Sequence, residues 1–262
     1  MIVGLHEDVC AELSGHKAHN LSKMWHAGLP VPPGFCMTWD AVERHDTSGL
    51  DSALAPLEAN TFAVRSSAVE EDGLHTSFAG ILASRLNLLS SEEIRSALHD
   101  IRDSAVAPSA VDYSTRRNLP HPIRVAAVVQ VFVPAVASGV LFMRDPNGAP
   151  GHFVVEACWG LGPGVVEGLV RPDRWLISEN GELISAHIAD KDIAIIPRAD
   201  GGTTQMLVDA SCRRRPCVPV ETLYELSRLA AECGRVFGGP QDIEWAVWDN
   251  RVWLLQSRPI TA

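Results

Sequence analysis

The chain has 262 residues and lacks the features of a membrane or exported protein. It has no apolar run of about 18 residues, the length needed for a membrane-spanning helix. The first eight residues include acidic side chains and no basic cluster, unlike a secretory signal peptide. We therefore expect a cytoplasmic protein that does not bind a membrane.

Positive charge is also scarce. The formal net charge is −10, and only Lys17, Lys23 and Lys191 supply lysine side chains. Broad nucleic-acid binding depends on a basic surface, so this composition argues against a nucleic-acid partner. A single nucleotide can still bind, because a local cluster of cations is sufficient for a phosphate group.

The six cysteines show no paired spacing typical of a zinc site. Cys212 and Cys217 are the only two that lie close in the sequence, and no second pair completes a set of four ligands. We expect free thiols. The glycine-rich stretch 160–168 also lacks the GxGxxG arrangement of a dinucleotide-binding turn.

The C-terminal stretch 240–259 predicts a β-hairpin that turns at Asp249-Asn250. Alternate residues of a strand share a face, so Asp242 and Glu244 point one way, as do Gln256 and Arg258. A loop with an odd number of residues places all four on one surface, whereas a two-residue loop separates Gln256 from Glu244. We favour the odd loop and a Mg-phosphate site; the alternative is an edge hairpin with solvated charges.

Two cations nearer the N-terminus occupy positions suited to phosphate binding. Lys17 follows the turn Ser14-Gly15 at the expected start of a helix, where the amides also attract anions. Arg65 closes a buried strand and precedes a polar, glycine-containing loop at 66–80. The alternatives are a surface lysine, and an arginine paired with an acidic residue of that loop.

Strands and helices alternate irregularly, which predicts an α+β fold. The polar, proline-containing stretch 103–124 separates two subdomains, 1–123 and 124–262. Residues 197–217 are expected to form a loop, and 220–237 one long amphipathic helix.

Several segments together resemble the ATP-binding domain shared by phosphoenolpyruvate synthase, pyruvate phosphate dikinase and rifampin phosphotransferase. The matching stretches are 15–34, 64–87, 128–146, 155–174 and 240–259, in the order of the family. They include VRSSA at 64–68, SFAG at 77–80 and LQSRP at 255–259. The resemblance implies an ATP-grasp fold with the nucleotide bound between two subdomains.

The resemblance also implies roles for individual residues. Lys17, Arg65 and Arg258 are similar to the family's phosphate-binding and catalytic cations, and Glu244 and Gln256 to its Mg²⁺ ligands. Loop 72–80 would close over the triphosphate. Adenine would meet the hinge strand formed by Gln130, Val131, Phe132 and Val133. Phosphoryl transfer requires positioning and charge neutralisation, which this set of residues can supply.

Two departures from the family pattern are visible. His16 and Ala18 flank Lys17 where the family usually has glycine, and His19 replaces a small residue, so the phosphate site could be narrower. The family's swivelling domain with its phospho-accepting histidine also has no counterpart among the ten histidines. His75, in the closing loop, is the one weak candidate.

We therefore expect an ATP-dependent phosphotransferase component that uses Mg-ATP and a separate phosphohistidine partner protein. One alternative is a stand-alone kinase for a small molecule. Another is a nucleotide-binding module without turnover.

Overall fold

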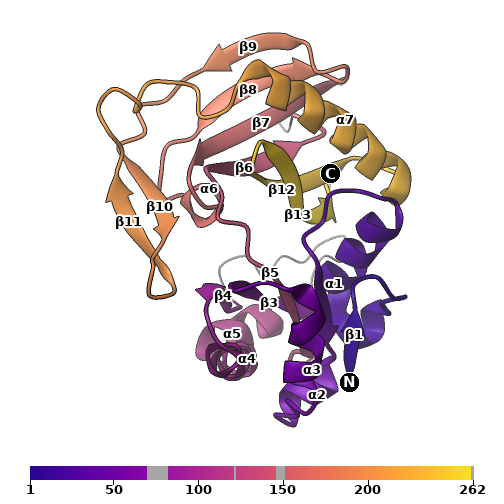
Figure 1. Cartoon of the computed structure of the whole chain (residues 1–262). Helices are drawn as coiled ribbons and strands as arrows, with labels where there is room; N and C mark the ends of the chain where they lie inside the picture. Colours follow the sequence, from indigo (N-terminus) through magenta and orange to yellow (C-terminus); the bar gives the residue numbers. More distant parts are fainter. Residues whose placement is uncertain (70–81, 121, 146–150, 261–262) are drawn as a thin grey trace. The chain divides into compact units, whose positions relative to one another are not determined.

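The computed structural model describes residues 1–69, 82–120, 122–145 and 151–260 (Figure 1). Helices and antiparallel strands alternate, so the predicted α+β class is confirmed. Contacts between Cα atoms divide the chain into two compact units. Unit 1 comprises Met1–His26, Pro32–Phe132 and Ala199–Gly202, and unit 2 comprises Ala27–Val31, Val133–Arg198 and Thr203–Ala262. Within the described ranges, no helix has the length and apolar character required to cross a bilayer.

Unit 1 is built on an antiparallel sheet of five strands. Its strand order is β1-β2-β5-β3-β4, so strands distant in the sequence become neighbours. The strands are β1 (Ile2–Gly4), β2 (Gly34–Met37), β3 (Phe62–Ala68), β4 (Ser84–Leu88) and β5 (Val125–Val131).

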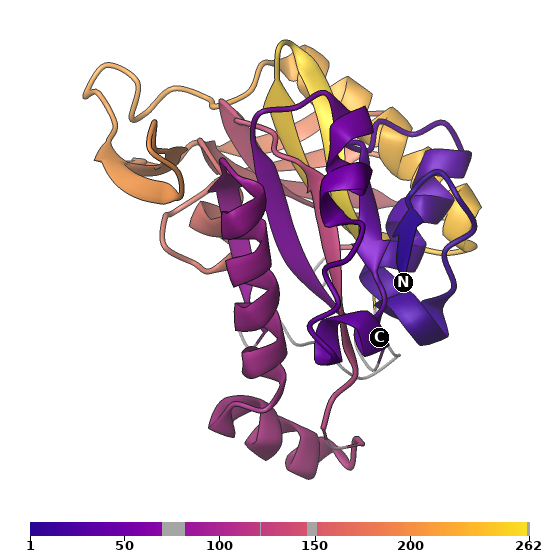
Figure 2. The same ribbon diagram turned by 60° about the horizontal axis from the view of Figure 1, so that its bottom comes forward.

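Helices of unit 1 cover both faces of this sheet. On one face, α2 (Trp39–Glu43) and α4 (Ser91–Ala105) pack against β3 and β5, and Figure 2 shows α4 along the strands. The short α3 (Leu50–Leu54), η1 (Ala55–Leu57) and α5 (Pro108–Arg117) extend this layer. Helix α1 (Ala11–His26) contacts β3 and β5 through Ser67 and its neighbours, which lie on the other face.

The alternation of side chains along β3 explains this division. Phe62, Val64 and Ala68 belong to the apolar cluster beneath α4. Because alternate residues point to opposite faces, Arg65 and Ser67 lie on the face of α1. One strand therefore supplies the apolar core on one side and polar groups on the other.

Unit 2 is built on a six-stranded antiparallel sheet with the order β13-β12-β6-β7-β8-β9. Its strands are β6 (Ala137–Phe142), β7 (His152–Trp159), β8 (Asp173–Ser178), β9 (Leu183–His187), β12 (Gln241–Trp248) and β13 (Arg251–Pro259). A separate two-stranded sheet contains β10 (Ile193–Pro197) and β11 (Thr203–Leu207), and α6 (Pro163–Val166) is a single turn.

Helix α7 (Val220–Phe237) covers one face of the larger sheet and has the predicted bounds (Figure 1). It buries Leu223, Leu226 and Leu229, which recur at helical spacing. The sheet buries Ile243 and Trp245 of β12, whose neighbours Asp242 and Glu244 point to the opposite face.

Stretch 103–124 contains α5, which begins at Pro108, a residue well tolerated in a first helical turn. Two sequence expectations about organisation differ from the structure. Stretch 197–217 contains β11, whose residues are all exposed and therefore lack an apolar alternation. The contact division falls between Phe132 and Val133 rather than at 123/124, because β5 pairs with β2 and β3.

Candidate functional site

Lys17 lies just after a break in helix α1, not at its start. The helix begins at Ala11, and Gly15 interrupts it with φ 73° and ψ 165°. The Lys17 side chain is 6% exposed, and its ammonium donates a hydrogen bond of 2.7 Å to the carbonyl of Ser66 in β3. The expected turn at Ser14-Gly15 and the helix start near Lys17 are therefore confirmed, but another helical segment, which begins at Ala11, precedes the turn.

Arg65 is brought close to Lys17 by this contact. The carbonyl that accepts from Lys17 belongs to Ser66, the next residue after Arg65. Arg65 is half-buried and lies on the α1 face of β3. The structure thus joins two of the predicted phosphate-binding cations across 48 residues of sequence; the roles themselves stay predictions.

The residues that depart from the family pattern around Lys17 have local partners. Ala18 is fully buried, and its amide donates to the Ser67 hydroxyl at 3.1 Å. His19 Nδ1 lies 2.7 Å from the carbonyl O of Val9. His16 Nδ1 is buried and has no hydrogen-bond partner within the described ranges. Ala18 and His19 are thus accommodated by contacts within unit 1.

The predicted hinge residues lie at the end of β5 and just beyond it. Gln130 is 3% exposed, and its side-chain amide donates to the carbonyl of Pro32 at 2.9 Å. The amides of Val131 and Phe132 donate to the carbonyls of Pro33 and Thr61. The side chain of Gln130 therefore anchors the strand, and the amides of Val131 and Phe132 are engaged within unit 1; the adenine-binding role of the hinge stays a prediction.

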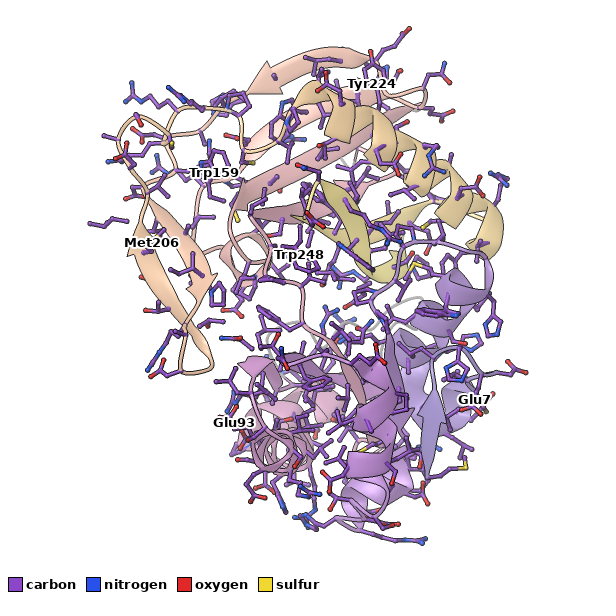
Figure 3. The ribbon with its side chains drawn as sticks, viewed as in Figure 1. Glu7, Glu93, Trp159, Met206, Tyr224 and Trp248 are labelled. Atoms are coloured by element: carbon purple, nitrogen blue, oxygen red, sulfur yellow. The ribbon has the colours of Figure 1, made fainter. Side chains whose placement is uncertain are left out.

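The C-terminal hairpin has a two-residue turn, so the expected odd loop is wrong. Trp248, labelled in Figure 3, pairs with Arg251, and the intervening Asp249 and Asn250 have φ of 51° and 55°. Two positive φ values are typical of a type I′ turn, which matches the twist of paired strands.

A β-bulge nevertheless brings the four predicted side chains to one face. The register shifts between Glu244 and Trp245: Trp245 pairs with Leu254, whereas Glu244 pairs with Gln256, leaving Leu255 as the extra residue. Beyond the bulge, Asp242 pairs with Arg258. An extra residue in one strand reverses the alternation that a two-residue turn would impose. The predicted arrangement is therefore present for a different reason.

These four side chains form a compact polar group. Gln256 is 5% exposed and Glu244 is half-buried. Arg258 donates from Nε to Asp242 Oδ2 at 2.7 Å. Burial raises the pKa of Asp242, Arg258 opposes this shift, and the charge of Glu244 adds to it. Asp242 thus serves as the partner of Arg258, while Glu244 and Gln256 present an oxygen pair.

The donor set suits a magnesium ion completed by other ligands. A carboxylate and an amide oxygen are hard donors, and Mg²⁺ is commonly bound by one or two protein groups together with phosphates and waters. Among the described residues, no three His, Cys, Asp or Glu side chains cluster to hold a metal without such help. The assignment of Glu244 and Gln256 as ligands stays a prediction.

Sequence reasoning missed two charged residues on the same face of the sheet. Glu156 of β7 lies in one cross-strand row with Glu244, separated by Val140 of β6, and pairs on its other side with Arg174 of β8. Arg174 Nε lies 3.9 Å from Glu156 Oε1, and an Arg174 terminal nitrogen lies 3.6 Å from Asp145. Strand register alone reveals this row, so the sequence carried no clear signal for it.

The predicted closing loop 72–80, with His75 and the SFAG motif, lies outside the described residues.

Comparisons with known proteins agree on one family. Residues 49–262 match the family described as pyruvate phosphate dikinase, AMP/ATP-binding domain. The chain is 36% identical to prodigiosin synthesizing transferase PigC of Serratia marcescens over 94% of its length. It is 30% identical to a "probable phosphoenolpyruvate synthase" of Methanocaldococcus jannaschii over 95%, and to rifampicin phosphotransferase of Bacillus subtilis over 100%.

The chain spans only part of these three relatives, namely 31%, 26% and 36% of their lengths. Among solved structures, it is similar to PH1788 from Pyrococcus horikoshii, with a TM-score of 0.50 and 13% identity. That match covers 96% of this chain and 93% of the other. At this identity the likeness concerns the fold alone.

Proposed function

The chain belongs to the family of pyruvate phosphate dikinase AMP/ATP-binding domains and has its ATP-grasp fold, and from this premise we propose that it is a phosphotransferase component acting on Mg-ATP. The observation that carries the proposal is the register of the C-terminal hairpin. It sets Glu244 opposite Gln256 and Arg258 opposite Asp242 on one face of the sheet. This face of the sheet then carries a pair of oxygen donors for a metal ion, an arginine for a phosphate, and a carboxylate that orients the arginine.

In this proposal Glu244 and Gln256 hold the magnesium ion. The ion, when bound, neutralises charge on the phosphate oxygens. Arg258 reaches a phosphate with its terminal nitrogens, while its Nε stays on Asp242. The pairing of Gln256 with Glu244 fixes both oxygens on rigid, hydrogen-bonded strands rather than on a loop.

Lys17 and Arg65 supply the cations of unit 1. Phosphoryl transfer needs little covalent chemistry from the protein, so positioning of the phosphates by such cations is the main contribution. The hinge is proposed to recognise adenine through its backbone. The Val133 amide makes no backbone hydrogen bond to any described residue, unlike those of Val131 and Phe132. It can therefore donate to a ring nitrogen.

We further propose a histidine of a separate protein domain as the phosphate acceptor. This rests on the family and on the share of its relatives that the chain covers, since those proteins are about three to four times as long. The two alternatives are direct phosphorylation of a small molecule and nucleotide binding without turnover. The assays described below distinguish them from transfer to a histidine. The protein is proposed to act in the cytoplasm.

Calorimetric titration with ATP, with and without Mg²⁺, tests the proposal. We expect Mg-dependent binding by the wild type and a loss of at least about tenfold in Glu244→Gln, because even residues behind a metal's ligands often change affinity ten- to a hundredfold. Glu221→Gln is the matched control: it removes the same charge from an exposed position in α7 and should bind as the wild type does.

The products formed from ATP then distinguish the three candidate functions. Formation of AMP only when a partner protein is present supports the dikinase-type reaction. Formation of ADP with one added metabolite supports a small-molecule kinase, and binding without either product supports a module without turnover. Equal Mg-ATP affinity in Glu244→Gln and wild type would contradict the metal assignment.

A further inference from the structure

The break in α1 touches strand β3 more closely than any residue with a side chain would allow. A Cβ atom placed on Gly15 would lie 2.3 Å from the carbonyl oxygen of Ser67 and 2.5 Å from its hydroxyl oxygen. The backbone of Gly15, with φ 73° and ψ 165°, is in a region populated almost only by glycine. Helix and strand therefore meet backbone to backbone at this point.

One hydroxyl group spans the break. Ser67 Oγ donates to the carbonyl of Ser14 at 2.7 Å and accepts from the amide of Ala18 at 3.1 Å. Ser14 precedes Gly15 and Ala18 follows it, so the two bonds hold the segments on both sides of the break. Ser67 is 0% exposed, which protects both bonds from competition with water.

Lys17 lies between Ser14 and Ala18, the two residues that the Ser67 hydroxyl bonds. Its backbone is adjacent to Ala18, and its ammonium bonds the carbonyl of Ser66, the residue before Ser67. A lysine side chain has four rotatable carbon bonds, so its ammonium is placed well only if its backbone is fixed. The ammonium of Lys17 is thus bonded to Ser66, and the backbone amide next to Lys17 is bonded to Ser67, so adjacent residues of β3 hold the two ends of this side chain.

We propose that Ser67 is a positioning residue for Lys17: its hydroxyl fixes the first turn after the break, which holds the ammonium beside Arg65 where phosphates bind. This inference rests on the proposed function of Lys17. The Ser67 hydroxyl is fully buried, and its hydrogen bonds go to the residues on either side of the break, Ser14 and Ala18. It therefore acts through Lys17 and does not itself touch nucleotide.

The test compares Mg-ATP with adenosine in Ser67→Ala. Small displacements of a positioned group cost up to about a hundredfold, so we expect Mg-ATP affinity to fall about tenfold or more. Adenosine affinity should stay unchanged, because adenosine has no phosphate for Lys17 to bind. Ser114→Ala is the matched control: Ser114 is also 0% exposed and its hydroxyl donates to a backbone carbonyl, but within α5.

A double-mutant cycle distinguishes positioning from general stability. If Ser67 acts through Lys17, Ser67→Ala should have no further effect on Mg-ATP affinity in a Lys17→Met background. An equal loss in that background, or an equal loss of adenosine binding, would overturn the inference. So would unchanged Mg-ATP affinity in Ser67→Ala.

Two remaining outcomes are also decisive. If Ser67→Ala does not fold by circular dichroism, Ser67→Cys replaces it, since a thiol fills the space of the hydroxyl, although it is somewhat larger, and is only a weak donor; it must show the same selective loss. Failure of both variants to fold would make the role of Ser67 purely structural. Absence of Mg-ATP binding by the wild type would overturn the proposed function itself, whereas binding with an unaffected Ser67→Ala overturns this inference alone.

Discussion

The buried ion pair of Lys191 and Asp173 offers a direct test of how unit 2 is held together. Both side chains are 0% exposed, and the ammonium of Lys191 bonds Asp173 and, at 3.2 Å, the carbonyl of Ala189. Asp173 also accepts the amides of Ala189 at 2.9 Å and Cys217 at 3.0 Å. A single carboxylate on β8 thereby holds both ends of the segment 189–217.

The substitution Lys191→Met removes the charge but keeps an unbranched apolar chain. It leaves Asp173 as a buried carboxylate that keeps its two amide donors and its contact with the Cys217 thiol. Removing one partner of a buried pair costs about 3–5 kcal/mol, because the remaining charge is neither solvated nor neutralised. Since two donors remain, we expect the lower end of this range, a loss of about 3 kcal/mol in the free energy of unfolding.

Urea denaturation at neutral pH, followed by tryptophan fluorescence and far-UV circular dichroism, measures this loss. The transitions from the two probes must coincide before one free energy is assigned. Arg116→Met is the matched control, because the Arg116–Asp112 pair spans 2.8 Å but its side chains are 75% and 59% exposed. Loss of such an exposed pair should cost less than about 1 kcal/mol.

A double variant sharpens the result. Combining Lys191→Met with Asp173→Asn removes both charges, so it should be more stable than Lys191→Met alone. A loss below about 1 kcal/mol for Lys191→Met, with an unchanged dependence on urea, would refute the reasoning. The carboxylate would then be satisfied by its amide donors without the lysine.

Two further predictions concern the hairpin face. Because burial raises the pKa of Asp242 above 3.8, the stability that this group contributes is greatest below that value and is lost as the pH rises through the raised pKa. Urea denaturation across this range should therefore show a smaller decline with pH for Asp242→Asn than for wild type; parallel curves would contradict the shift. Deletion of Leu255 removes the bulge and turns Gln256 and Arg258 to the other face. Mg-ATP binding should be lost in calorimetry, and retained binding would contradict the role of the bulge.

Local sequence patterns determine several elements, because their causes are local. The helix at 220–237 follows from apolar residues at helical spacing and ends at Gly238, which adopts the left-handed conformation. Helix α4 begins after Ser90, whose hydroxyl accepts a hydrogen bond from the amide of Glu93. The Glu93 carboxylate accepts a hydrogen bond from the amide of Leu89. Both capping bonds join residues within 89–93, so they are encoded locally.

The hairpin shows where local reasoning ended. Residue types and alternation predicted that Glu244 and Gln256 could share a face, but the reason given, an odd loop, was wrong. The turn at Asp249-Asn250 has two residues, and the bulge at Leu255 corrects the register. On its other side β12 pairs with β6 in an unbroken register, so the position of the bulge depends on the whole sheet.

The sequence by itself determined the family, the α+β class and the identity of the polar residues in the candidate site. Tertiary structure alone decided that Lys17 meets the strand of Arg65, that Asp173 and Lys191 are buried together, and that Glu156 and Arg174 join the row of Glu244. The physical reason is sequence separation. Capping and periodicity act within a few residues, whereas these contacts join residues that only strand pairing and packing bring together.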